Sequence, residues 1–76
     1  ELDFNIYPNP TNSECIINSS KNIEKLRIFD ISARLCISKD FYSNNIILDV
    51  RTLSPGVYTI ELITAEESVK RQLIIQ

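Results

Sequence analysis

Apolar and polar residues alternate over most of this chain, and the alternation has a period of two. It is clearest in the second half, where apolar side chains recur at every other position. The two best examples are Ile46, Leu48 and Val50, followed by Tyr58, Ile60 and Leu62. A period of two places successive side chains on opposite faces of an extended strand, so one face can be buried while the other meets water. The pattern therefore predicts an all-β protein.

Turn-forming residues divide the apolar runs into segments of strand length. Asn, Ser, Pro and Asp lie between the runs, at intervals of roughly 8–12 residues, which is typical of an antiparallel β-sandwich. We expect about seven strands, at 3–7, 14–18, 24–31, 34–39, 45–50, 56–64 and 67–75. The segment 23–33 also has apolar residues at helical spacing. We favour a hairpin there, because Asp30 and Ser32 both stabilise turns.

The first expected strand ends at Tyr7-Pro8-Asn9-Pro10. The two prolines fix their φ angles and remove two amide donors, so a central strand cannot continue through them. Asn9 precedes a proline, which favours extended backbone, and its side chain can hydrogen-bond nearby backbone groups. We interpret the motif as a rigid corner of the fold, although by itself it is also compatible with a plain turn.

A second turn motif is the segment 53–58, with the sequence LSPGVY. Pro55 and Gly56 suit the second and third positions of a β-turn. Gly56 is the only glycine of the chain, and its place before the strand 56–64 predicts a backbone with positive φ. Tyr58 can bury its ring while its hydroxyl stays near a polar partner. We interpret these residues as builders of the fold.

The expected strand 67–75 has a basic beginning and an apolar end. Its last residues are Lys70, Arg71, Gln72, Leu73, Ile74, Ile75 and Gln76. A terminal strand commonly lies at a sheet edge, where unpaired backbone groups can accept a strand from another protein. This segment is our candidate recognition site. The alternative is an ordinary closing strand with a solvated basic pair.

Length and charge narrow the possible functions. With 76 residues and a net charge of −2, the chain is expected to be one domain, 1–76, without the basic surface that nucleic acids require. A chain of this size buries about 60% of its unfolded surface, so its core is too thin to enclose a substrate.

The chain has no apolar run long enough to span a membrane and no secretory leader at residues 1–15. Because it begins without Met, we expect a piece of a longer protein.

The chain lacks the residue sets that most catalytic sites need. It has no His, which rules out Ser–His and Cys–His pairs, and a single Gly, which rules out a glycine-rich phosphate loop. Cys15 and Cys36 cannot complete a zinc site without His. They form either a disulfide, if their strands adjoin, or two buried core thiols. We therefore predict a protein that is not an enzyme and that has no metal site and no cofactor.

Taken together, the motifs resemble the type A C-terminal sorting domains of the type IX (Por) secretion system of Bacteroidota. The resemblance covers the chain from about Phe4 to Gln76, including an apolar-aromatic-Asp segment before the first hairpin. The residues that match the structural motifs of the family are Tyr7, Pro8, Asn9, Pro10, Asp30, Leu53, Pro55, Gly56 and Tyr58. Two positions depart from the family pattern, because Ala33 replaces the usual Gly and Gln72 replaces the usual Lys.

This resemblance implies an Ig-like antiparallel β-sandwich that acts as a secretion signal for an attached cargo protein. The implied partners are the outer-membrane type IX translocon, its shuttle proteins and a sortase-like signal peptidase that removes the domain. The cargo would travel through the periplasm to the cell surface or the medium. In isolation, an exposed end strand could be swapped between copies to form a dimer.

Two other functions stay open at this point. A carbohydrate-binding or adhesive accessory module needs exposed aromatic side chains that stack on sugars. Phe41 and Tyr42, expected in a loop, are the only candidate pair. An inert spacer of fibronectin type III character is the other alternative, and it would be followed by further sequence.

Overall fold

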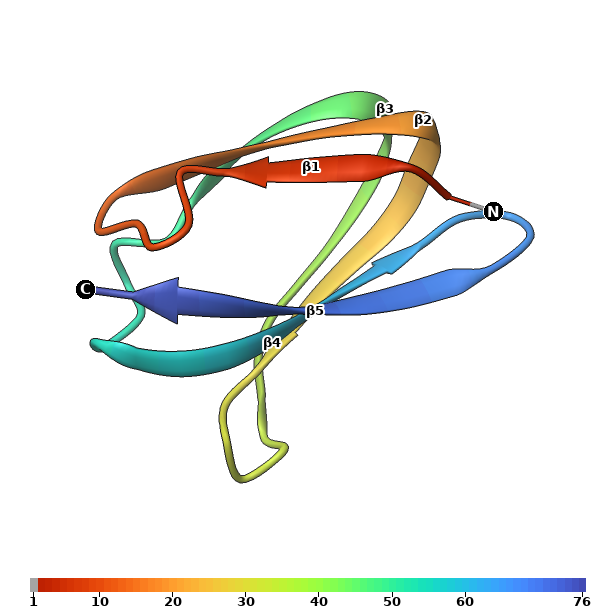
Figure 1. The fold of residues 1–76 in the computed structure, drawn as a ribbon. Coiled ribbons are helices and arrows are strands. Elements are labelled where there is room, and N and C mark those ends of the chain that lie inside the picture. Colours follow the sequence, from red (N-terminus) through yellow and green to blue (C-terminus); the bar gives the residue numbers. More distant parts are fainter. Residues whose placement is uncertain (1) are drawn as a thin grey trace.

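The fold is a curled antiparallel sheet, described for residues 2–76 by a computed structural model (Figure 1). Within this range the protein is all-β and has five strands, which are β1 (Phe4–Tyr7), β2 (Glu14–Phe29), β3 (Leu35–Asp49), β4 (Gly56–Ile63) and β5 (Ser68–Ile75). The expected all-β, antiparallel class is confirmed. The described residues include no helix that could cross a membrane.

β2 organises the sheet, because both of its edges are paired. One edge pairs with β3 along nearly the whole strand. The other edge pairs with β1 in the first half, where Ile17 lies opposite Ile6, and with β4 in the second half, where Ile28 lies opposite Ile60. β5 follows on the far side of β4. Since β1 and β4 share one edge of the bent strand β2, the sheet curls until β1 and β5 face each other, running in the same direction (Figure 1).

The structure has five strands in residues 2–76, and the expected seven-strand Ig-like sandwich is not confirmed. Each of β2 and β3 covers two of the expected segments, namely 14–18 with 24–31 and 34–39 with 45–50. Between these segments the pairing of β2 with β3 shifts register on both sides of Ile23. Such bulges add unpaired residues and bend a strand without ending it. The polar residues there therefore turn both strands around the core instead of separating them.

The hairpin expected in segment 23–33 is confirmed, and Asp30 holds it together. The Asp30 carboxylate accepts hydrogen bonds from the backbone N–H of Ser32 at 2.8 Å and of Arg34 at 3.0 Å. Arg34 Nε adds a third bond at 3.0 Å. These bonds, the Arg34 N–H first, lower the pKa of Asp30 below its usual range. Ala33, where the family usually has Gly, has a φ of 66° in the left-handed region.

The hydrophobic core lies on the inner side of the curled sheet, and most of its side chains come from β2, β3, β4 and β5. Its buried members are Cys15, Ile17, Ile23, Leu26, Ile28, Ile46, Leu48, Val50, Tyr58, Ile60, Leu62, Leu73 and Ile75. Both apolar triplets that carried the strand prediction are among them, so the alternation identified the buried face correctly. The accessible surface is 4659 Å², close to the value of about 4,700 Å² expected for a folded chain of this mass.

Both cysteines are free thiols, so the disulfide alternative is not realised. Cys15 is fully buried, and burial raises its pKa to about 11. The expectation of a second core thiol is wrong, because Cys36 is exposed. A register shift explains the difference: Phe29 pairs with Leu35, whereas the residue before Phe29 pairs with Ile37. Cys36 is thus the extra residue of a bulge and loses the alternation of its neighbours.

Candidate recognition site

β5 carries the candidate recognition residues except Gln76, which follows it, and divides them between its two faces. Leu73 and Ile75 face the core and are 0% and 4% exposed. Lys70, Gln72 and Ile74 lie on the opposite, outer face, where the first two are exposed and Ile74 is half-buried. The folded domain can therefore present these three side chains to a partner, while the two core residues hold the strand in place.

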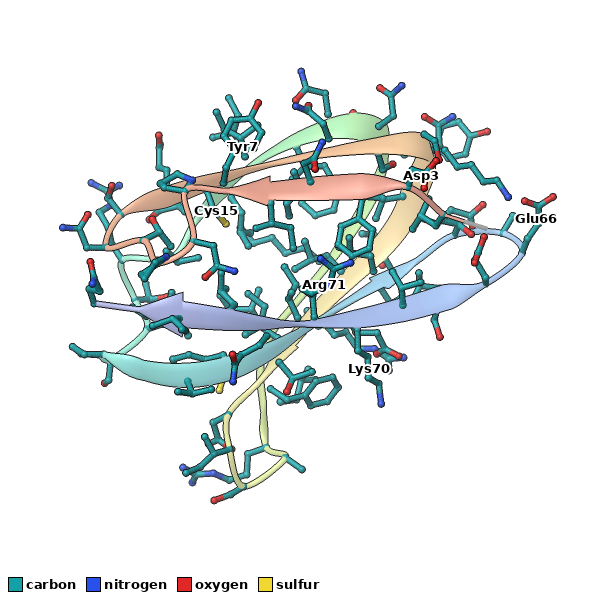
Figure 2. The ribbon with its side chains drawn as sticks, viewed as in Figure 1. Asp3, Tyr7, Cys15, Glu66, Lys70 and Arg71 are labelled. Carbon is teal, nitrogen blue, oxygen red and sulfur yellow. The ribbon has the colours of Figure 1, made fainter. Side chains whose placement is uncertain are left out.

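The two basic residues of β5 have different surroundings. Lys70 and Arg71 leave the strand on opposite sides (Figure 2). The Arg71 guanidinium lies 4.4 Å from the ring centroid of Phe4 in β1, a cation–π contact between the two facing strands. Lys70 forms no ion pair within residues 2–76. The basic pair is therefore divided, with Arg71 joining β5 to β1 and Lys70 left available on the outer face.

The Tyr7-Pro8-Asn9-Pro10 motif reverses the chain beside the end of β5, as expected of a corner. The peptide bonds before both prolines are cis. The Asn9 side chain reaches the backbone of β5, where Nδ2 donates to the carbonyl oxygen of Gln72 at 3.0 Å. Asn9 Oδ1 accepts from the N–H of Ile74 at 3.1 Å. The corner therefore contacts the candidate site directly, which the sequence pattern did not predict.

Thr11 continues this contact with its main chain. Its N–H donates to the carbonyl oxygen of Ile74 at 3.0 Å, and its own carbonyl oxygen accepts from the N–H of Gln76 at 2.8 Å. These two bonds form a parallel bridge between Thr11 and Ile75. Thr11 is itself buried and was not singled out in the sequence. The sequence showed only a Thr directly after the proline corner, which does not reveal that this residue is buried against β5.

Tyr7 lies on the outside of the sheet and does not touch the candidate site (Figure 2). Its side chain is 46% exposed, and its hydroxyl accepts a hydrogen bond from Asn18 Nδ2 at 2.8 Å. Asn18 belongs to β2, so this bond ties the end of β1 to its neighbour. Tyr7 therefore supports the corner rather than the recognition strand.

The connection into β4 contains a turn just before the expected one. The Leu53 N–H donates to the carbonyl oxygen of Val50 at 3.0 Å, so the hydrogen-bonded turn spans residues 50–53. Pro55 follows as a bend and Gly56 begins β4. The φ of Gly56 is 158°, positive as expected and rarely adopted by residues with a side chain. The only glycine thus marks the entry into the strand rather than the centre of the turn.

Tyr58 links this connection to β5. Its ring is 8% exposed, and its hydroxyl donates to the carbonyl oxygen of Ser54 at 2.6 Å, as expected for a buried ring with a satisfied polar end. In the β4–β5 pairing, Tyr58 lies opposite Leu73, and Gly56 lies opposite Ile75. Both turn motifs of the sequence therefore converge on the C-terminal half of β5, one on each of its edges.

An ion pair lies next to Lys70 on the outer face, on the side of β4. Arg27 Nε of β2 lies 3.1 Å from Glu61 Oε1 of β4, and Glu61 is opposite Lys70 in the β4–β5 pairing. The Arg27–Glu61 contact is close but poorly aligned, so it is an ion pair without a hydrogen bond at Nε. Because these two charges balance each other, Lys70 contributes a net positive charge to the outer face.

Two features considered in the sequence, a metal-binding cluster and a pair of stacked aromatic rings, are absent from the described residues. Residues 2–76 contain no cluster of three or more His, Cys, Asp or Glu side chains that could hold a metal ion. Phe41 and Tyr42 lie within β3, where consecutive side chains point to opposite faces. Phe41 packs against the core and Tyr42 is 75% exposed. The two rings therefore do not form one aromatic surface.

The fold and the convergence of the motifs on β5 define a small all-β domain whose C-terminal strand is held on both edges. Residues 5–76 match the family of secretion system C-terminal sorting domains. Since the match includes nearly the whole chain, the protein belongs to this family, and the resemblance seen in the motifs is confirmed. Its members are sorting signals for type IX secretion, which implies interaction with that machinery and export to the cell surface or beyond. No curated protein matches the chain.

Proposed function

We propose that the type IX machinery recognises this domain through the outer face of β5, at Lys70, Gln72 and Ile74. The supporting observation is the convergence of both turn motifs on this strand, through Asn9 on one edge and Tyr58 on the other. Residues that fix a strand from both sides are expected where the strand itself is the feature that a partner reads.

Recognition of this kind would depend on folding. Leu73 and Ile75 are buried, and Arg71 rests on Phe4 of another strand, so the outer face exists only when the sheet has closed. An unfolded chain would not hold Lys70 and Ile74 at fixed positions. The outer-membrane translocon and its shuttle proteins would then select cargo whose signal domain is complete.

We further propose that residues 1–76 form one sorting domain of a larger secreted protein, and that a sortase-like peptidase removes it after export. In this scheme the cleavage point lies before or near Glu1, and the mature cargo at the surface or in the medium lacks the domain. The folded core, which includes strands from Phe4 onward, supports a cut outside rather than within the sheet.

A reporter fusion tests the export function. A secretory leader, a fluorescent protein and residues 1–76 are joined and expressed in a bacterium with an intact type IX system and in its translocon mutant. We expect reporter at the surface or in the medium of the first strain only, shortened by the 8.7 kDa of the domain. Full-length reporter held in the periplasm of both strains would reject the proposal.

Paired substitutions on two strands test the recognition face. Lys70→Glu and Ile74→Asp alter the outer face of β5, while Lys39→Glu and Ile47→Asp make the same changes at exposed positions of β3. We expect the β5 variants to lower export about tenfold, equivalent to a loss of roughly 1.4 kcal/mol in binding, with the β3 variants unaffected. Equal export by all four folded variants would place recognition elsewhere.

A further inference from the structure

The outer edge of β5 is covered over its C-terminal half. Gln72, Ile74 and Gln76 direct backbone groups away from β4, and Asn9 and Thr11 hold these groups at distances of 2.8–3.1 Å. Edge strands with free N–H and C=O groups readily pair with another chain. At this edge the groups already have partners within the same molecule, so an incoming strand would have to displace them.

The covering bonds have the pattern of a parallel strand. In a parallel pair, one residue donates to the residue before its partner and accepts from the residue after it. Thr11 does this around Ile75 with its main chain. Asn9 does the same around Leu73 with its side-chain amide, which carries a donor and an acceptor like a peptide group. The rung next to that of Thr11 is therefore made by a side chain instead of the main chain.

We propose that Asn9 is a strand-mimicking latch which, with Thr11, closes the outer edge of β5 and prevents a second copy of this chain from pairing there. The proposal goes beyond the export function and rests only on the geometry of the corner. It also assigns the early Pro-Asn-Pro motif and the C-terminal segment to one structural unit.

A second copy is the occupant that this edge fits best once it is open. The N–H and the carbonyl oxygen of Ile74 both point outward. Two such edges can therefore pair antiparallel about Ile74, with two-fold symmetry and the same surface on each copy. The triplet from Leu73 to Ile75 contains neither charge nor proline, the features that usually protect an edge. Without the latch, this edge has no protection of its own.

Asn9→Asp weakens the Asn9 part of the latch with the least change of shape, so that an incoming strand has only the two main-chain bonds of Thr11 left to displace. The carboxylate keeps an acceptor for the Ile74 N–H, but it places an oxygen where Nδ2 donates to the carbonyl of Gln72. Asn12→Asp is the matched control, because Asn12 is exposed in the same loop and makes no side-chain hydrogen bond within residues 2–76. Both variants gain the same negative charge, so a difference between them reports the lost contact.

Amide hydrogen exchange and sedimentation of the purified chain give the readouts. In Asn9→Asp we expect the Ile74 amide to exchange about five to ten times faster, because a weakened hydrogen bond favours local opening. We also expect a concentration-dependent dimer, while the original chain and Asn12→Asp stay monomeric. The amide of Ile60, in the centre of the core, serves as the folding reference. If that amide also loses protection, Asn9→Ser, which removes the amide without adding charge, replaces the variant.

Two results would overturn the proposal. The first is unchanged protection of Ile74 in the folded variant, which would mean that Asn9 does not hold the edge. The second is a fast-exchanging Ile74 in a chain that stays monomeric at millimolar concentration, which would mean that Asn9 is not what prevents pairing at this edge. Neither result bears on the export function, which the reporter fusion of the unaltered domain tests independently.

Discussion

Replacement of Ala33 by glycine should stabilise this domain. Ala33 has a φ of 66° in the turn between β2 and β3, and a left-handed backbone costs an L-residue about 1–2 kcal/mol. Glycine avoids this cost, but it increases the entropy of the unfolded chain by an amount worth about 0.4–1 kcal/mol. The middles of the two ranges differ by about 0.8 kcal/mol, which is the net gain that we expect in the free energy of unfolding.

Thermal and urea unfolding followed by circular dichroism measure this gain, since the chain has no Trp for fluorescence. For a domain of this size the gain corresponds to a rise in Tm of about 2–8 °C. The control is Ala65→Gly, at the only other alanine, which does not have a positive φ. That variant should lose about 0.4–1 kcal/mol. If both glycines lowered Tm to the same extent, the backbone at Ala33 would not be strained and the reasoning would fail.

Three further predictions concern the core, the pH dependence and the thiols. Leu73→Ala should lower the free energy of unfolding by about 2–5 kcal/mol, measured by urea unfolding; a loss below about 1 kcal/mol would show that the end of β5 is not packed. The Arg51 side chain, which hydrogen-bonds the carboxylate of Asp49, lowers the Asp49 pKa from its ordinary 3.8 to about 2. A lowered folded-state pKa stabilises the fold above pH 3.8, and this contribution disappears as the pH falls to about 2; Asp49→Asn should flatten that part of a stability curve, and an unchanged slope would contradict the assignment. A maleimide should modify Cys36 in the folded chain and Cys15 only after unfolding, because Cys15 is buried with a pKa of about 11; equal labelling in a mass spectrum would refute the burial of Cys15.

The period of two was enough to predict the buried face of most strands. Ile60 and Leu48 were expected in the core and are 0% and 1% exposed. This succeeds because side-chain direction in a strand is set locally by the backbone, whichever strand lies beside it. The turn chemistry was equally local, since Asp30 bonds residues two and four positions ahead of it.

The pattern was less informative where the strands bend. Bulges near Ile23 and at Cys36 shift the pairing by residues that have no special sequence signature. As a result two long bent strands were expected as four short ones, and Cys36 was expected in the core. A bulge depends on the register of both strands together, which no single segment can specify.

The sequence by itself determined the all-β class, the faces of the strands, the positions of the corners and, through its motifs, the sorting-domain family. Only the tertiary structure decided which distant residues those corners contact. Asn9 reaches backbone groups 63 and 65 residues further along the chain, and Arg71 reaches the ring of Phe4. These contacts arise because β2 pairs with β1 and β4 on the same edge and curls the sheet until its two ends meet. Residue periodicity describes each strand separately, whereas the curl is a property of all the strands together.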